Sequence, residues 1–238
     1  MPSAIPSSAA LLEIEKQLDC RKYRYVVGVD EVGRGSWAGP MYVGAVAYQL
    51  QSLLNTLLRS PDERVPESFS ESSRRDEYLK VDDSKKLSAR VRESLVGPIK
   101  ALACGCGIGI VEPTELDSLG MTSGFRLGLD RALVQMNEFV SCGIVLIDGV
   151  VGFHREGQSL AIPKGDTKSF AIASASIIAK VDRDSRMTVE SESYPWYGFE
   201  KNKGYPSPVH VSALHALGPS PIHRKSWSYI SRLPWRKP

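Results

Sequence analysis

The sequence is poor in the residues that build zinc sites. It has four cysteines and four histidines in 238 residues, no CxxC pair, and no HxxxH spacing among His210, His215 and His223. A zinc site is therefore not expected. The sequence also lacks an apolar run of membrane-spanning length, and no basic stretch precedes an apolar core near its first residue. We expect neither a membrane span nor a signal peptide, and by default a cytoplasmic location.

No charge of one sign dominates the chain. The net charge is +3, which is mildly basic and does not by itself indicate a nucleic-acid partner. The hydrophobic content of 42% and charged content of 24% are typical of a soluble globular protein, and the length suits one α/β domain. Cys104 and Cys106 fall on one face of an expected strand. They could bind a metal as a pair, but small buried thiols in a reduced cytosol are the simpler interpretation.

Hydrophobic periodicity and turn residues divide the chain into strands and helices. Strands are expected at 25–30, 41–50, 104–111, 143–149 and 159–166, and helices at 11–18, 88–102, 112–136, 169–192 and 210–217. Three leading strands can form a meander, to which parallel crossovers add the others. This order predicts an α/β fold with a mixed five-stranded sheet flanked by helices. Residues 1–192 would form the main domain, with a surface insertion at 60–77, and residues 193–238 a helical C-terminal extension.

Four acidic residues stand where expected strands end or a helix begins. Asp30 and Glu31 close the first strand, Asp148 closes the fourth, and Asp166 precedes the longest helix. Ligands of α/β sheets bind at the carboxyl ends of strands, so these side chains can converge. Oxygen ligands without a nearby Cys or His pair favour Mg²⁺ or Mn²⁺, and two such ions can clamp a phosphodiester. The alternative is that the acids are ordinary strand-end caps or salt-bridge partners.

A glycine-rich stretch, GRGSWAGP, follows the first acidic pair after a single residue, Val32. Its glycines at 33, 35 and 39 do not match the GxGxxG of dinucleotide-binding loops, and the acids before it would repel a pyrophosphate. Gly33 and Gly35 can instead let the backbone approach a sugar-phosphate closely, with Arg34 on a phosphate. This interpretation requires cations between the acids and the phosphate.

Other polar residues are candidates for substrate contact. Lys85 lies in DDSKKLS, and Ser176, Lys180 and Arg183 share a face of the longest expected helix. They form either a phosphate-binding stripe or a plain solvated face. Tyr205, in NKGYPSPVH, suits stacking on a sugar or base from a loop stiffened by proline, or it packs against its own loop.

Several blocks of the sequence together resemble one family. GVDEVGRGSWAGP is similar to the D-E-A-G-R-G-x-x-A-G-P block of ribonuclease HII of bacterial type, and DDSKKLS and LIDG match its D-S-K-K-L and V-D-G blocks. KGDTKSFAIASASIIAKVDRD resembles its G-D…I-A-A-A-S-I-I-A-K-V-x-R-D block, and NKGY with GPSPIHRKSW its late blocks. The blocks keep the family's order from Val26 to Trp227, almost the whole chain.

The resemblance implies an RNase H-like fold and a metal-dependent endoribonuclease. Such an enzyme would cleave RNA in RNA–DNA hybrids and nick duplex DNA on the 5′ side of a single embedded ribonucleotide, leaving a 3′-hydroxyl and a 5′-phosphate. The implied site residues are as follows: Asp30, Glu31, Asp148 and Asp166 bind two Mg²⁺ or Mn²⁺ ions; Gly33, Arg34 and Gly35 sense the ribose 2′-hydroxyl; Tyr205 packs on that ribose; Lys85, Ser176, Lys180 and Arg183 contact phosphates.

The sequence departs from the family pattern in three places. Val32 replaces an alanine after the acidic pair, Pro206 and Ser207 replace the G-T of G-Y-G-T-x-x-H, and residues 60–77 form a longer segment than is usual. None of these changes removes an acid. The change beside Tyr205 alters the loop that would read the 2′-hydroxyl.

Two other functions are compatible with parts of the pattern. A DNA-cutting nuclease of the same fold would share the acids but ignore the 2′-hydroxyl, and a non-catalytic nucleic-acid-binding module would lack the acid set, because bare carboxylates repel phosphates. The C-terminal SYISRLPWRKP shows no clear clamp-binding peptide. We therefore expect a monomer without an obligate protein partner.

Overall fold

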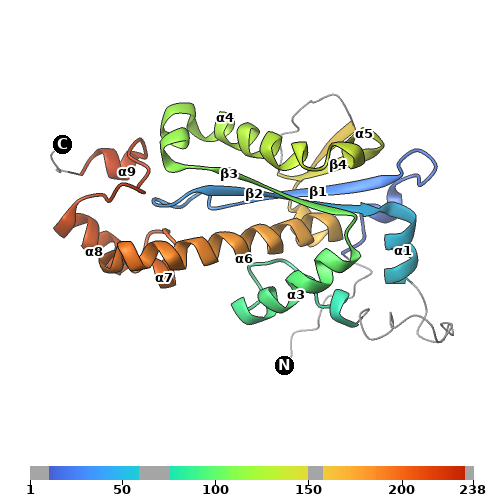
Figure 1. The fold of residues 1–238 in the computed structure, drawn as a ribbon, viewed down its shortest axis with the longest axis horizontal. Coiled ribbons are helices and arrows are strands. Elements are labelled where there is room, and N and C mark those ends of the chain that lie inside the picture. The colour runs from blue at the N-terminus through green and yellow to red at the C-terminus, as the bar shows by residue number, and fades with distance from the viewer. Residues whose placement is uncertain (1–10, 59–75, 150–157, 234–238) are drawn as a thin grey trace.

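One mixed sheet forms the centre of the protein (Figure 1). The structure is a computed structural model that describes residues 11–58, 76–149 and 158–233. The strands are β1 (Tyr25–Val32), β2 (Met41–Gln49), β3 (Gly105–Val111), β4 (Gly143–Asp148) and β5 (Gln158–Ile162), in the order β3-β2-β1-β4-β5. The first three are antiparallel neighbours, and β4 is parallel to both β1 and β5. The predicted meander and mixed five-stranded sheet are thus confirmed.

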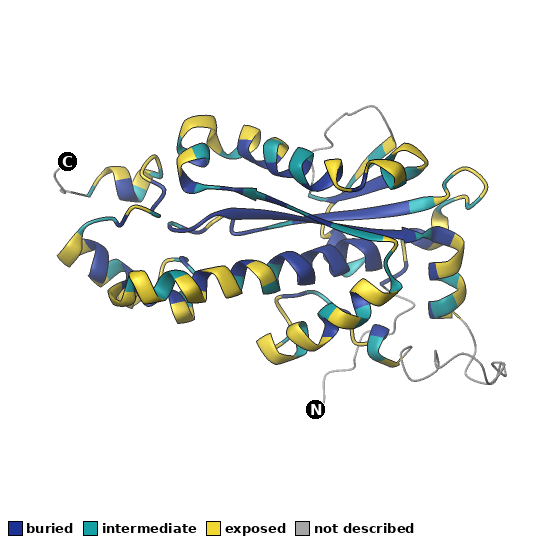
Figure 2. Cartoon of the chain, in the orientation of Figure 1, coloured by how far each residue is buried: buried dark blue, intermediate teal, exposed yellow. Residues whose placement is uncertain are grey.

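Helices cover both faces of this sheet. They are α1 (Leu50–Leu58), α3 (Ala89–Leu102), α4 (Pro113–Val134), α5 (Asn137–Ser141), α6 (Phe170–Ser193), α7 (Phe199–Asn202), α8 (Pro208–Leu217) and α9 (Ser228–Ser231). In Figure 1, α4 and α5 lie on one side of the strands, and α3 and α6 on the other. Strands β1, β2 and β4 are buried along most of their length, β3 is buried at alternate residues, and β5 is partly exposed (Figure 2). Within the described part of the chain, no helix has the length and apolar character needed to cross a bilayer.

Helix α6 packs unusually close to the sheet. A Cβ atom added at Gly28 of β1 would lie 2.0 Å from the backbone carbon of Ala171, and one at Gly44 of β2 would lie 2.5 Å from the Ala175 oxygen. The small residues on both elements therefore allow backbone to contact backbone. This packing fixes where each residue of α6 sits relative to the carboxyl end of β1.

Replacing Gly28 by alanine should destabilise the protein by about 3 kcal/mol or more, because the new methyl group meets main-chain atoms that cannot move aside. Gly97→Ala is the matched control, since nothing lies within 4 Å of its Cβ position, and its effect should stay below about 1 kcal/mol. Urea denaturation at equilibrium measures both. Equal effects of the two substitutions would contradict this account of the packing.

Three expectations about local structure were wrong. The predicted helix at 11–18 is a single turn of 3₁₀ helix, η1 (Glu15–Gln17). Helix α1 was missed, although its buried Leu50, Leu53 and Leu57 follow a helical spacing. Strand β1 continues to Val32, so the first two acids lie inside the strand and not at its end. Residues 60–75 of the predicted insertion lie outside the described residues.

The cysteine prediction also needs correction. Cys104 is exposed and precedes β3, and Cys106 is only partly buried. Neither is a small buried thiol of the core. Among the described residues, no group of three or more Cys, His, Asp or Glu side chains is arranged to hold a metal ion, so a cysteine-based metal site has no support.

The 3₁₀ turn at the start of the described chain exists because Glu15 caps another helix. The Glu15 side chain is fully buried, and its Oε1 accepts hydrogen bonds from the Ser169 hydroxyl at 2.6 Å and the Ala171 amide at 3.1 Å, at the beginning of α6. Its Oε2 has no partner in the described structure. Burial raises the pKa of Glu15 to about 7, despite these hydrogen bonds.

Glu15→Gln should remove a pH-dependent loss of stability. A carboxyl whose pKa is raised in the folded state stabilises the fold at low pH, and this contribution is lost as pH rises from about 4.5 to about 7. The free energy of unfolding of the variant relative to wild type should therefore rise between pH 4.5 and 8, by on the order of 1–3 kcal/mol. Urea titrations across this range test it. The exposed Glu13→Gln is the control, and the same slope in both variants would refute the assignment.

A smaller core joins the C-terminal segments to the rest of the chain. Tyr197 of the 3₁₀ turn η3 (Pro195–Tyr197), Phe199 of α7 and Leu214 of α8 pack with Ala38 and Met187. The last two come from the glycine-rich loop and from α6. The predicted helical C-terminal extension is thus present, and it packs directly against the loop that follows β1.

Candidate active site beside helix α6

Two of the predicted acids lie on neighbouring parallel strands. Val29 pairs with Ile147 in the last pair of the β1–β4 ladder, so Asp30 and Asp148 occupy adjacent positions just beyond it. The amide of Gly165, in the 3₁₀ turn η2 (Gly165–Thr167), donates to Asp148 Oδ1 at 2.7 Å and places Asp166 beside them. Tertiary structure therefore brings together acids that are more than a hundred residues apart in sequence.

The buried carboxylates repel one another. Burial raises the pKa of Asp30 to about 8; a hydrogen bond from Ser176 opposes the rise, and the charges of Glu31, Asp148 and Asp166 add to it. Burial likewise raises the pKa of Asp148, where the Gly165 amide opposes the shift and Asp166 adds to it. An ordinary strand-end cap would not gather like charges in this way. The alternative interpretation of these acids is therefore disfavoured.

Two basic side chains partly balance the cluster. Lys85 Nζ lies 3.3 Å from Asp166 Oδ2, and Arg34 Nη1 lies 3.3 Å from Glu31 Oε1. Both basic side chains are more than half exposed. Burial raises the pKa of Glu31, and Arg34 opposes that shift. Exposed partners of this kind screen a buried carboxylate only weakly.

The donor set fits a hard divalent cation. It consists of carboxylate oxygens, which Mg²⁺ and Mn²⁺ prefer, and no Cys or His of the described residues joins them in a metal-binding group. In the described structure the acids do not form a closed coordination group. Their mutual repulsion is nevertheless what a bound divalent ion would relieve. The residues that could hold such an ion are Asp30, Glu31, Asp148 and Asp166.

Asp30→Asn separates charge repulsion from metal binding. Without divalent ions the variant should melt at a higher temperature than wild type, because it loses a buried carboxylate that neighbouring acids repel. Saturating Mn²⁺ should stabilise wild type by about 2–4 kcal/mol at 100–1,000 times the dissociation constant, and the variant by less. Thermal unfolding with EDTA and with Mn²⁺ measures both effects. Glu138→Gln, an exposed acid on α5, should behave as wild type; an equal Mn²⁺ response in Asp30→Asn would exclude Asp30 from the site.

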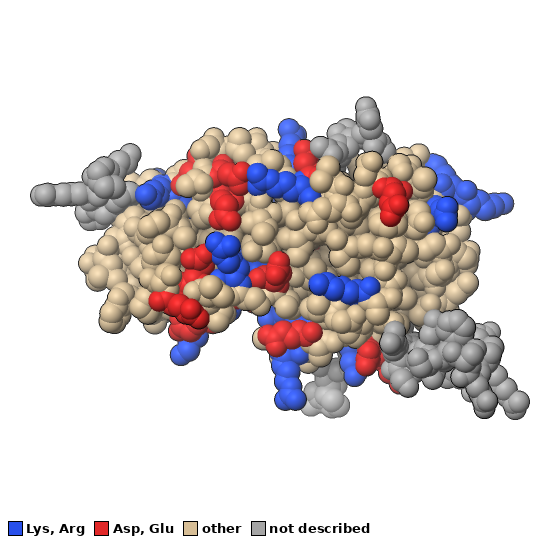
Figure 3. Space-filling model, in the orientation of Figure 1, with Lys and Arg blue, Asp and Glu red and all other residues tan. Residues whose placement is uncertain are grey.

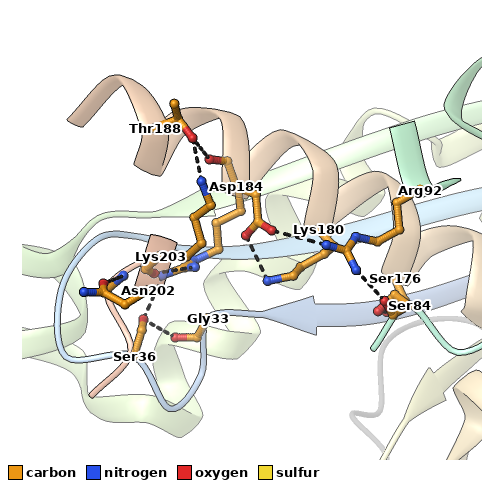
Figure 4. A network of polar contacts seen from close by, with 12 residues as sticks. Gly33, Ser36, Ser84, Arg92, Ser176, Lys180, Asp184, Thr188, Asn202 and Lys203 are labelled. Atoms are coloured by element: carbon orange, nitrogen blue, oxygen red, sulfur yellow. Dashed lines mark hydrogen bonds and ion pairs between the residues drawn. The ribbon is translucent and has the colours of Figure 1, made fainter. Parts of the chain in front are cut away.

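Ser176 and Lys180 of α6 face other protein groups (Figure 4). Ser176 is buried, and its hydroxyl lies 2.8 Å from that of Ser84 while it also hydrogen-bonds Asp30. Lys180 donates to Asp184 Oδ1 at 2.9 Å, and Arg92 Nη2 lies 3.7 Å from Oδ2 of the same carboxylate. Neither residue belongs to a plain solvated face. On the face shown in Figure 3, basic and acidic side chains are interspersed and form no continuous basic stripe.

Arg183 is not placed as predicted. Its side chain is fully buried, and its guanidinium donates to the Pro40 carbonyl at 2.8 Å, the Lys203 carbonyl at 3.0 Å and the Ser36 hydroxyl at 2.8 Å. It therefore lies neither on a surface stripe nor on a solvated face. Its contacts hold the loop after β1 against the loop before Tyr205. A fixed, planar set of donors is well suited to this task.

The glycine-rich loop has a conformation that its sequence only partly reveals. Gly33 has a φ of +92°, and a Cβ there would meet the Arg183 Nε at 2.2 Å, so both backbone and packing require glycine. Gly35 has open space around it. Its missing side chain is therefore not explained by packing within the described part of the protein, and it leaves the backbone accessible from outside.

Tyr205 belongs to the same assembly as the glycine-rich loop. The amides of Trp37 and Ala38 both donate to the Gly204 carbonyl, at 2.8 Å and 3.2 Å. The Tyr205 ring is partly buried, with the Arg183 guanidinium 5.4 Å and the Lys180 ammonium 5.8 Å from its centroid. The ring thus packs beside basic side chains of α6, and not only against its own loop, and still keeps an accessible surface.

Several residues of this region were missed by sequence reasoning. Arg224 is fully buried and donates from Nε to the Gly39 carbonyl at 3.0 Å and from Nη1 to the Arg34 carbonyl at 3.1 Å. His210 and His223 are buried with their Nε2 atoms 2.8 Å apart. Periodicity gives no signal for these positions, because an arginine in the polar run HRKSW has the pattern of a surface residue.

Fold and site together define a metal-dependent hydrolase of the RNase H-like fold class. The model of the family described as Ribonuclease HII matches residues 69–230. The chain is 36% identical over 227 residues to a ribonuclease HII of Chloroflexus aggregans, a match that covers 93% of this chain and 95% of the relative. The chain therefore belongs to the ribonuclease HII family, which hydrolyses phosphodiester bonds of RNA in RNA–DNA hybrids and depends on divalent metal ions.

Solved structures share the fold. Ribonuclease H2 from Pyrococcus horikoshii OT3 superposes with a TM-score of 0.63 at 24% identity, covering 87% of this chain and 95% of that one. Bst-RNase HIII in complex with Mn²⁺ superposes with a TM-score of 0.64 at 18% identity, covering 95% of this chain and 72% of that one. At such identities the structural similarity shows that the fold is shared, and it does not assign individual site residues.

Proposed function

We propose that this protein nicks duplex DNA on the 5′ side of a single embedded ribonucleotide, in addition to cleaving RNA in RNA–DNA hybrids, with two divalent ions. The observation that carries the proposal is the contact between two features. A partly buried cluster of acids lies beside a glycine-rich loop, to which the ion pair between Arg34 and Glu31 joins it, and two buried arginines, Arg183 and Arg224, hold the backbone of that loop from inside. The first suits phosphodiester hydrolysis, and the second suits recognition of a ribose.

Asp30, Glu31, Asp148 and Asp166 would hold Mg²⁺ or Mn²⁺. When bound, these ions supply an activated water and stabilise the charge that develops on the departing 3′ oxygen. The solved RNase HIII with Mn²⁺ supports this choice of ion for the fold. The products would carry a 3′-hydroxyl and a 5′-phosphate. The protein itself would orient the substrate, so that only the intended phosphate lies at the acids.

The loop at 33–35 and Tyr205 would read the ribose. The 2′-hydroxyl is the group that distinguishes RNA from DNA, and backbone groups around Gly35 are accessible to it. Tyr205 would pack against the same sugar, next to Pro206 and Ser207. The Ser207 hydroxyl accepts from the His210 amide at 3.2 Å and begins α8, so serine performs the capping task at this position.

Lys85 and Lys180 remain our candidates for phosphate contacts. Lys85 is largely exposed at the edge of the acidic cluster, and Lys180 is about one-fifth exposed between Asp184 and the Tyr205 ring. Ser176 acts instead through its hydrogen bond to Asp30. We further propose that the protein works as a monomer in the cytoplasm without an obligate protein partner.

A duplex with one embedded ribonucleotide should be nicked in the presence of Mg²⁺ or Mn²⁺, and an all-DNA duplex should stay intact. Asp30→Asn should lower the rate by about 10³-fold or more, because several kcal/mol of charge stabilisation is lost. Denaturing gel electrophoresis of end-labelled strands measures the nick and its position. Glu138→Gln is the control.

Each rival function predicts a different gel. Equal cutting of both duplexes would identify a DNA nuclease of the same fold. Tight binding without any cutting, under both metals, would identify a binding module. An Asp30→Asn enzyme as fast as wild type would refute the metal-site assignment.

A further inference from the structure

The segment from Ser220 to Arg224 connects the two loops that surround the proposed ribose site. Its backbone pairs with the end of the glycine-rich loop: the Gly39 amide donates to the Ile222 carbonyl at 2.9 Å, and the Arg224 amide donates to the Trp37 carbonyl at 2.8 Å. Ala38 and His223 form an antiparallel bridge between these bonds. The segment thus adds a short strand-like edge to the loop.

The Arg224 side chain links this segment to the part of the loop that we propose contacts the substrate. Its guanidinium holds the carbonyls of Arg34 and Gly39, five residues apart, and thereby fixes the arc between them. Its Nη2 has no hydrogen-bond partner in the described structure, and its guanidinium lies 5.1 Å from the Trp227 ring centroid. Burial lowers the pKa of Arg224 to about 9, so the group stays charged at neutral pH. Burying a charge with one donor unpaired is costly, and a role in function explains why the residue is there.

The preceding residue, His223, reaches the other loop through His210. The Ser220 amide donates to His223 Nδ1 at 2.9 Å, so the proton of His223 is on Nε2. His210 Nδ1 lies 2.9 Å from the Tyr205 carbonyl, which only accepts, so the proton of His210 is on Nδ1. His223 Nε2 therefore donates to His210 Nε2, and burial lowers the pKa of both rings, which keeps them neutral.

Two consecutive side chains thus extend in different directions from one short segment. Arg224 holds the backbone of Arg34, and His223 holds the backbone of Tyr205 through His210. We propose that His223 and Arg224 are positioning residues that set the spacing between the 33–35 loop and Tyr205, and so determine how strongly the protein distinguishes a ribonucleotide from a deoxyribonucleotide. This inference rests on the proposed function.

The physical reason is the short range of hydrogen bonding. A donor or acceptor for the 2′-hydroxyl is effective only within a few tenths of an ångström of its best distance, whereas contacts to the phosphate backbone tolerate larger shifts. A change in the spacing of the two loops should therefore reduce ribose discrimination while leaving the general affinity for duplex DNA unchanged. The acids lie on β1, β4 and η2, and not on this segment.

Binding of two duplexes to the full chain tests the proposal. One duplex is all DNA and the other carries one ribonucleotide, and Ca²⁺ replaces Mg²⁺ because its larger, looser coordination keeps hydrolysis slow. In wild type the ribonucleotide duplex should bind more tightly. Arg224→Lys keeps the charge but cannot donate to both the Arg34 and the Gly39 carbonyls. The ratio of the dissociation constant of the all-DNA duplex to that of the ribonucleotide duplex should therefore fall by about fivefold, the effect of one hydrogen bond. The affinity for the all-DNA duplex should change less than about twofold.

A second variant and a matched control complete the test. His223→Gln keeps one donor and one acceptor but cannot span Ser220 and His210, so it should lower the ratio as well. Arg232→Lys, an exposed arginine at the end of α9, should leave it unchanged. Circular dichroism establishes that each variant is folded.

Two results would overturn the inference while leaving the proposed function intact. One is an unchanged ratio in folded Arg224→Lys and His223→Gln proteins. The other is an equal loss of affinity for both duplexes, which indicates a merely structural role. A wild-type protein that neither prefers nor nicks the ribonucleotide duplex would refute the proposed function, and this inference with it.

Discussion

The backbone contact between α6 and the sheet determines the geometry of the whole site. Because Gly28 and Gly44 have no side chains, α6 lies against β1 and β2 at a fixed height. The helix then presents different groups along its length. Glu15 and Ser169 hold its start, Ser176 contacts Asp30, and Arg183 supports the glycine-rich loop. One rigid element thereby places the acids and the loop relative to each other, which loops alone could not do.

Electrostatics opposes this arrangement. Burial raises the pKa of Asp30, Glu31 and Asp148, neighbouring carboxylates add to the rise, and the basic side chains that contact the cluster, Lys85 and Arg34, are exposed. A chain selected only for stability would avoid such a cluster. The same conflict appears at Arg224, whose third nitrogen is buried without a partner. Both of these unfavourable arrangements lie where the protein is proposed to bind metal and ribose, which agrees with a functional origin.

Much of the site could be predicted from the sequence. The block around Asp30 and the short apolar run before Asp148 identify strands by their β-branched residues, and the glycines beside them mark backbone that must approach closely. The bounds of the first strand could not be predicted well, because pairing with β2 extends it through Glu31 to Val32. The 3₁₀ turn at Glu15 could not be predicted either. The local sequence has a helical pattern, but the Glu15 side chain caps the start of α6, which lies far along the chain.

The sequence by itself determined the family of this protein, because the order of its blocks specifies ribonuclease HII. It also supplies the four carboxylates, the glycine-rich loop and the aromatic residue that we propose for the site. Only the tertiary structure decided which polar residues face inward. Arg183, His223 and Arg224 stand in polar runs that resemble surface segments, and all three are buried. The physical reason is that they satisfy backbone carbonyls and ring nitrogens of segments distant in sequence. Such partners become neighbours only when the chain folds, so no local pattern can reveal them.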